Sequence, residues 1–186
     1  MDATQSLLDV FSSLQNGTAL SIFQRILLIT DGTVTDVVEA YGGEAIQVVK
    51  LAQSFGQADP LKPPLDLFDA ERVLRRTVLL QGTISGTNYI HADSVIAPDR
   101  LPSEVLDGLL MTGRPLGRLL AQQRIETFRD IVGVGFEPAG DCASFFGVDP
   151  TSNLVFRTYR IHLNGQPVVR ITEKFPTTWF TSPLEL

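Results

Sequence analysis

The pattern of apolar and polar residues divides the chain into a helical opening and a longer region of paired strands. Three segments have apolar residues at helical spacing and are predicted helices: 3–15, about Leu20–Ile29, and Val34–Tyr41. Each is followed by a glycine-containing stop signal, namely Asn16-Gly17, Asp31-Gly32 and Gly42-Gly43. Ser21 and Gln24 have the spacing of a capping box, and Thr33 can cap the third helix. The first quarter of the chain is therefore predicted to be helical.

The rest of the chain is rich in β-branched and aromatic residues in alternating runs, which is typical of strands. The predicted strands are Ala45–Leu51, Arg72–Leu80, Asn88–Ala97, Arg124–Glu137 and the two halves of the hairpin Leu154–Pro176. A long surface loop is predicted where prolines cluster, at Pro60, Pro63 and Pro64. Ser103 is expected to cap a helix that ends at Gly113, and a short helical turn is expected over about Arg118–Gln123.

Hairpins dominate this pattern, and no alternation of strand, helix and parallel strand is visible. We therefore predict one α+β domain over 1–186, with about six antiparallel strands and with helices covering one face and forming flaps. The N-terminal helix over 3–15 and the tail 177–186 are expected to be peripheral. In the strand Arg124–Glu137, alternation assigns four apolar residues to one face: Phe128, Val132, Val134 and Phe136.

Composition narrows the range of partners and compartments. The chain has 186 residues and a formal net charge of −6, and it lacks a cluster of Lys and Arg, so we expect neither a nucleic-acid nor a membrane partner. Cys142 is the single cysteine, which excludes an intramolecular disulfide and fits a reducing compartment. The opening residues lack the basic start of a signal peptide, and no apolar run reaches membrane-spanning length. We expect a cytoplasmic protein.

The hairpin Leu154–Pro176 places a carboxylate among apolar residues. Asn164-Gly165 favours a type I′ turn between its two strands, because both central residues of that turn need positive φ. Alternation then gives the second strand one face with Val169, Ile171, Glu173 and Phe175, and another with Val168, Arg170, Thr172 and Lys174. A buried, isolated carboxylate is unfavourable, so Glu173 must be paired, protonated or functional.

A second charged residue with apolar neighbours lies in the strand VLRRTVLL. There Arg76 shares a face with Leu74, Val78 and Leu80, and an arginine stays charged. One interpretation is a buried structural ion pair between Arg76 and Glu173. The other is a pocket with a guanidinium at one end and a carboxyl group at the other, which suits a small anion that also carries a hydroxyl group. Composition does not decide between them.

Other chemical signals are weaker. Cys142 is far in sequence from His91 and His162, and two histidines without a ligand spacing do not indicate a metal site. The helix, turn and helix around Asp31-Gly32 could read DNA. However, the second helix carries Asp36 and Glu39 and no basic residue, which argues against that role.

Three motifs resemble a known family: RPLGRLL at Arg114–Leu120, RIETFRDIVGVG at Arg124–Gly135, and the hairpin sequence FRTYRIHLNGQPVVRITEKFP. Together with LRRTVLL and TDGTVTDVVEAYGG, they resemble chorismate pyruvate-lyase, most closely the branch found in cyanobacteria, plastids and some other microbes. The resemblance runs from about Leu20 to Pro176. It implies a six-stranded antiparallel sheet with helices, and the conversion of chorismate to 4-hydroxybenzoate and pyruvate without a metal or an organic cofactor.

The same resemblance implies site residues. Arg76 and Glu173 match the catalytic arginine and glutamate of the family, and Leu116 matches the leucine of one flap. The contact from the other flap falls at Val34, and Gly117 beside Leu116 is expected to offer a backbone N–H to the ligand.

Several alternatives remain open from the sequence. Arg129 is expected either to support the substrate-contacting residues from behind or to form an ion pair at the sheet edge. The domain as a whole could instead be a sensor, since the effector domains of one large class of bacterial repressors resemble this fold and bind small molecules without turnover. A third interpretation is a structural domain in which Arg76 and Glu173 only pair with each other.

Overall fold

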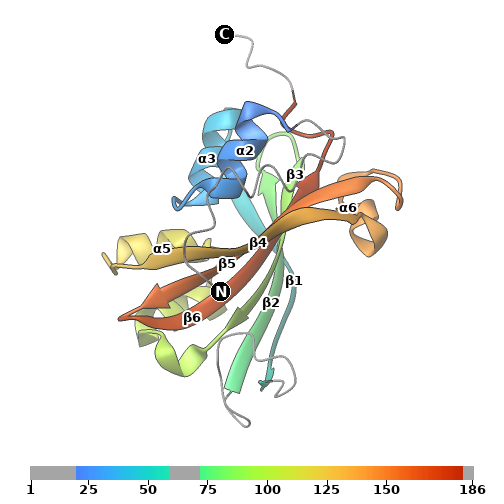
Figure 1. The fold of residues 1–186 in the computed structure, drawn as a ribbon. Helices are drawn as coiled ribbons and strands as arrows, with labels where there is room; N and C mark the ends of the chain where they lie inside the picture. The colour runs from blue at the N-terminus through green and yellow to red at the C-terminus, as the bar shows by residue number, and fades with distance from the viewer. Residues whose placement is uncertain (1–19, 59–71, 182–186) are drawn as a thin grey trace.

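One antiparallel sheet forms the frame of the protein. The computed structural model describes residues 20–58 and 72–181, and their six strands have the order β1-β2-β3-β6-β5-β4 (Figure 1). The strands are β1 (Ile46–Gln57), β2 (Arg72–Gly82), β3 (Asn88–Ile96), β4 (Phe128–Pro138), β5 (Asn153–Leu163) and β6 (Gln166–Pro176). The α+β class and the antiparallel sheet are as predicted. The predicted helix over 3–15 and the proline cluster lie outside the described residues.

The helices connect these strands. They are α2 (Ile22–Ile29), α3 (Val34–Gly42), α4 (Ser103–Met111), α5 (Leu116–Gln122) and α6 (Ala143–Phe146), with 3-10 turns η1 (Pro98–Arg100) and η2 (Gly140–Cys142). The predicted capping box is present at the start of α2, where Ser21 and Gln24 bond each other reciprocally. Thr33 is the N-cap of α3 but makes no side-chain cap bond, and Pro102 rather than Ser103 is the N-cap of α4. No described helix is long and apolar enough to cross a membrane.

The closing hairpin has the predicted turn, and its register shifts once between that turn and Glu173. Asn164 has φ 51° and Gly165 has φ 76°, as a type I′ turn requires. Beyond the register shift, Glu173 lies directly opposite Arg157 of β5, and it pairs with Ala92 of β3 on its other side. Because side chains alternate along each strand, these three residues share one face of the sheet.

A β-bulge changes the predicted face assignment in β4. The register shifts between Ile131 and Gly133. Because of this shift, Phe128 and Val134 point to opposite faces of the sheet. Phe128 is 66% exposed and lies against His162 on the face opposite the one that α2 to α5 cover. The prediction that all four apolar residues of this strand share one face was therefore wrong.

Two apolar clusters divide the covered face of the sheet along the strands. Helices α2 and α3 pack over one half, on residues that include Leu80, Ile90 and Phe175. Helices α4 and α5 pack over the other half, on residues that include Ala92 and Ile171. Among the described residues, the two clusters have one member in common, the partly buried Val48.

The tail expected to be peripheral begins inside the core. The ring of Phe180 is 4% exposed and contacts aromatic rings from α2, α3 and β6. The carbonyl of Phe180 accepts a hydrogen bond from Ser21, and those of Thr177 and Trp179 accept from Gln24. The capping-box residues thus also anchor 177–181 against α2, while 182–186 lie outside the described residues.

His91 is a buried titratable group on the opposite face of the sheet. Its ring stacks on Phe145 of α6, and its Nδ1 is 3.6 Å from the carboxylate of Asp93 without a hydrogen bond. Burial lowers the pKa of His91; Asp93 and Glu137 act against this shift, and Lys174 adds to it.

This shift predicts a loss of stability in mild acid. Since the folded-state pKa lies below the ordinary value of 6.5, the unfolded chain takes up the proton first as the pH falls through 6.5. Urea unfolding should therefore give a smaller free energy of unfolding at pH 5.5 than at pH 7.5. The variant His91→Gln should lose part of this difference, and a variant with the full wild-type difference would contradict the assignment.

Candidate functional site

A cavity opens at the boundary between the two apolar clusters. It encloses about 640 Å³ of space that protein atoms leave unfilled, part of it open to solvent. The floor is the covered face of the sheet, and all six strands contribute residues to it. The roof consists of two segments at helix starts: residues 32–35 at the start of α3 and residues 115–117 at the start of α5. The predicted site residues Val34, Arg76, Leu116, Gly117 and Glu173 all line it.

Glu173 is held by two side chains of the neighbouring strand β5. Its Oε2 accepts a hydrogen bond of 2.7 Å from Arg157 Nε, and its Oε1 accepts one of 3.0 Å from the hydroxyl of Tyr159. Arg157 is 2% exposed and stacks on the Tyr159 ring with its guanidinium carbon 4.7 Å from the ring centre. Burial, followed by the charge of Glu173, raises the pKa of Tyr159, so its hydroxyl remains a donor. Two donors thus hold the carboxyl group of Glu173 in one orientation, and its remaining lone pairs are available to a ligand.

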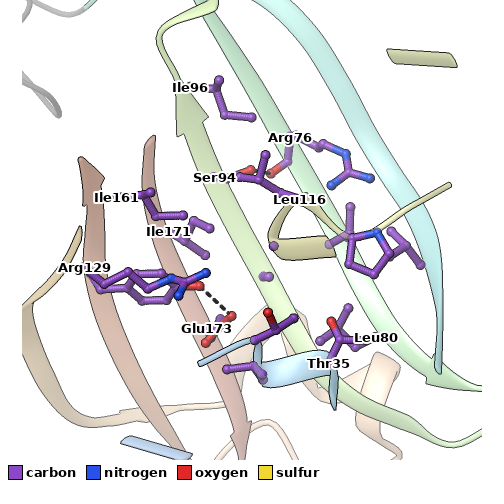
Figure 2. A pocket seen from close by; sticks show the side chains of 18 of the residues that line it. Thr35, Arg76, Leu80, Ser94, Ile96, Leu116, Arg129, Ile161, Ile171 and Glu173 are labelled. Atoms are coloured by element: carbon purple, nitrogen blue, oxygen red, sulfur yellow. Dashed lines mark hydrogen bonds between the residues drawn. The ribbon is translucent and has the colours of Figure 1, made fainter. Parts of the chain in front are cut away.

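Arg76 has no such partner. Arg76 is only 5% exposed. No described carboxylate lies within ion-pair distance of its guanidinium group. Its Nε is buried without any acceptor, and burial lowers the pKa of this guanidinium. Figure 2 places Arg76 and Glu173 on different strands around the cavity, and β3 lies between these two strands in the sheet. A buried cation without a counterion is unfavourable, and a bound anion would relieve that cost.

Two helix N-termini converge on the same space. Val34 begins α3 and Leu116 begins α5, and both helices lack a side-chain cap bond. The first amides of a helix have no partner within the helix and carry partial positive charge. Backbone N–H groups at Val34, Leu116 and Gly117 are therefore available at the cavity that also contains Arg76.

The two roof segments contact each other closely. A Cβ atom on Gly117 would lie 3.0 Å from Thr33 Cγ2, so the absence of a side chain there lets the segments meet. On the outer side, Arg118 of α5 bonds Asp36 at 2.7 Å and also pairs with Glu39, both in α3.

The connection between α2 and α3 is also tied down to the sheet. Arg157 Nη1 donates a hydrogen bond of 2.9 Å to the carbonyl of Thr30. Arg129 of β4 donates to the carbonyl of Asp31 and lines the cavity. The residue that fixes Glu173 thus also fixes one roof segment.

The interpretation in which Arg76 and Glu173 only pair with each other is wrong, because Glu173 pairs with Arg157. Sequence reasoning missed Arg157 and Tyr159, although the signal was present. In β5, alternation puts Val155, Arg157, Tyr159 and Ile161 on one face, so Arg157 is a charged residue among apolar ones, like Arg76.

The cysteine and histidine residues take no part in this cavity. Cys142 lies in η2, and burial raises the pKa of its thiol, which is the opposite of activation for a nucleophile. His162 bonds Asp130 on the open face of the sheet. Among the described residues, no group of three or more His, Cys, Asp or Glu side chains is arranged to hold a metal ion.

Comparison with known protein structures supports the fold. The effector domain of PhnF from Mycobacterium smegmatis aligns with a TM-score of 0.63 at 15% identity, over 80% of this chain and 90% of that domain. A GntR-family transcriptional regulator from Bacillus cereus aligns with a TM-score of 0.57 at 10% identity, over 76% of this chain and 98% of the other. At these identities the likeness concerns the fold alone.

Comparison of sequences is more specific. A chorismate pyruvate-lyase of Mycobacterium leprae is 35% identical over 152 residues, which cover 81% of this chain and 72% of that protein. A chorismate pyruvate-lyase of Mycobacterium tuberculosis is 31% identical over 158 residues, covering 81% of this chain and 78% of the relative. The model of the Rv2949c-like chorismate pyruvate-lyases matches residues 28–181. That match spans both roof segments, Arg76 and Glu173, and the chain belongs to this family.

Proposed function

We propose that the protein eliminates pyruvate from chorismate and forms 4-hydroxybenzoate in the cavity between the two helix pairs. The observation that carries this proposal is the buried, unpartnered guanidinium of Arg76 in a cavity that also contains the fixed carboxylate of Glu173. The guanidinium of Arg76 can bind the ring carboxylate of substrate and product, and the carboxyl group of Glu173 can bind the ring hydroxyl group. The names of the sequence relatives support the same reaction.

Arg76 has the role of anchor for the ring carboxylate. A guanidinium matches a carboxylate with two parallel hydrogen bonds, and low solvent access strengthens both. Backbone amides at Val34, Leu116 and Gly117 can supply further donors, because they begin helices and are uncapped. These groups fix the ring in one orientation, with its hydroxyl group toward Glu173.

Glu173 has the role of acceptor at the other end of the ring. Two of its lone pairs are used by Arg157 and Tyr159, which leaves others for the ring hydroxyl. Since Arg157 and Tyr159 hold the carboxylate rigidly, it is oriented before the substrate enters. We assign Arg157 and Tyr159 as positioning residues that act through Glu173.

The reaction needs little covalent help from the protein. The ring carbon that bears the hydroxyl group loses its hydrogen as a proton, and the C–H electrons form the last ring double bond. The bond from the neighbouring ring carbon to the enolpyruvyl oxygen breaks, and enolpyruvate takes up a proton to become pyruvate. Aromatisation drives these steps, so orientation, exclusion of water and stabilisation of charge are the main tasks. Glu173 lies where it can accept or relay the proton.

The alternative is a sensor domain that binds an aromatic acid without turnover. Its support is the structural likeness to the PhnF effector domain, at 15% identity. The lyase proposal accounts in addition for the sequence relatives. Tight binding of 4-hydroxybenzoate together with no consumption of chorismate by folded protein would favour the sensor.

The first prediction concerns the reaction itself. Purified protein incubated with chorismate should form 4-hydroxybenzoate and pyruvate in equal amounts, measured by chromatography and by a lactate dehydrogenase coupled assay. Glu173→Gln should lower kcat by about 10²- to 10⁴-fold, the range for loss of a proton-transfer group. Arg76→Met should weaken binding of 4-hydroxybenzoate by about 10- to 100-fold, since it loses charge-assisted hydrogen bonds. Folded wild-type protein without product would reject the proposal.

The second prediction concerns the ion pair that holds Glu173. Arg157→Met leaves a buried carboxylate without its cation and should lower the free energy of unfolding by about 3–5 kcal/mol. The double variant Arg157→Met with Glu173→Leu removes both charges and should be more stable than the single variant. Urea unfolding of the four proteins of this cycle measures the coupling. Additive losses would show that the two side chains are not coupled.

A further inference from the structure

We propose that Arg129 binds the second carboxylate of the substrate, the one on the enolpyruvyl group. This inference rests on the proposed function and adds a residue that distinguishes substrate from product. Chorismate carries two carboxylates, whereas 4-hydroxybenzoate retains only the one on the ring. A site that binds both substrate carboxylates needs a second cation at the end of the cavity where the enolpyruvyl group lies.

Arg129 lies at that end. In the register of β4 and β5 it pairs with Ile161, and its side chain lines the cavity on the same face as Tyr159. Figure 2 shows the Arg129 side chain reaching toward Glu173, far from the Arg76 side of the cavity. In chorismate the enolpyruvyl ether is on the carbon next to the hydroxyl group. If the hydroxyl binds Glu173, the enolpyruvyl carboxylate lies on the Arg129 side.

The charges around the cavity match a dianion. The described lining residues include two cations, Arg76 and Arg129, and one carboxylate, Glu173. Arg157 neutralises Glu173 from outside the cavity. Two positive charges therefore remain, one for each carboxylate of the substrate, while the benzoate product uses one of them.

Arg129 also has donors to spare. No described carboxylate pairs with it, and its one hydrogen bond runs from Nη1 to the neutral carbonyl of Asp31. A guanidinium has five N–H donors, so Nε and Nη2 remain for a ligand. Because Asp31 belongs to the roof connection, a substitution of Arg129 can also loosen the roof, and the test must separate these two effects.

The test compares the affinities of two ligands. Arg129→Gln should raise the KM for chorismate by about 10- to 100-fold, the effect of losing charge-assisted hydrogen bonds, while the inhibition constant of 4-hydroxybenzoate stays close to its wild-type value. Arg129→Lys keeps the positive charge but loses the planar guanidinium group that can bind a carboxylate with two hydrogen bonds. It should therefore give a KM for chorismate between those of wild type and Arg129→Gln. Arg118→Gln is the control for a loosened roof, because Arg118 joins the two roof segments from outside. It should change the binding of both ligands by the same factor.

Each outcome has a clear meaning. A loss confined to chorismate supports the second carboxylate site. Parallel losses for chorismate and 4-hydroxybenzoate, as in Arg118→Gln, would overturn it in favour of a roof contact, and an unchanged KM would overturn it outright. If Arg129→Gln does not turn over, the dissociation constants of both ligands are measured by calorimetry in a Glu173→Gln background, with the same criteria. Failure of wild-type protein to convert chorismate would instead reject the proposed function.

Discussion

The site depends on a buried arginine, Arg76, for which the described residues provide no counterion. Transfer of an ion from water into a protein interior costs several kcal/mol, and an ion pair usually offsets that cost. Glu173 has such a partner in Arg157, whereas the Nε of Arg76 has no acceptor. A stable fold can carry one such unfavourable group where function requires it. An anion that binds next to Arg76 removes this unfavourable free energy of burial, and this gain contributes to its affinity.

The cavity exists because the two helix pairs cover the same sheet face without meeting over its middle. Each pair buries its own apolar cluster, and the boundary between them is roofed only by the starts of α3 and α5. Helix starts are the parts of helices with free N–H groups, so the roof is polar on its inner side. The ion pairs of Arg118 and the contact of Gly117 with Thr33 hold the two starts together. Opening for substrate or product must separate those contacts.

Much of this arrangement could be predicted from the sequence, since it follows from local rules. Alternation along β6 puts Glu173 on the covered face, although a register shift between Ile161 and His162 means that the turn at Asn164-Gly165 alone does not predict which residue of β5 lies opposite it. Arg76 follows by the same reasoning. Alternation along β5 also puts Arg157 on the covered face, so the sequence contained the signal for this residue and the prediction overlooked it. The bulge at Val132 has no such signal, because a shift of register depends on how two distant strands fit together. The same holds for the meeting of Gly117 with Thr33.

The central claim is that the unpaired guanidinium of Arg76 binds the ring carboxylate. The most direct measurement compares 4-hydroxybenzoate with 4-hydroxybenzamide, which has nearly the same shape but no charge, by calorimetry on wild-type protein. Our account predicts that the acid binds about 10- to 100-fold more tightly than the amide, because only the acid supplies the missing anion. Equal affinities would contradict it.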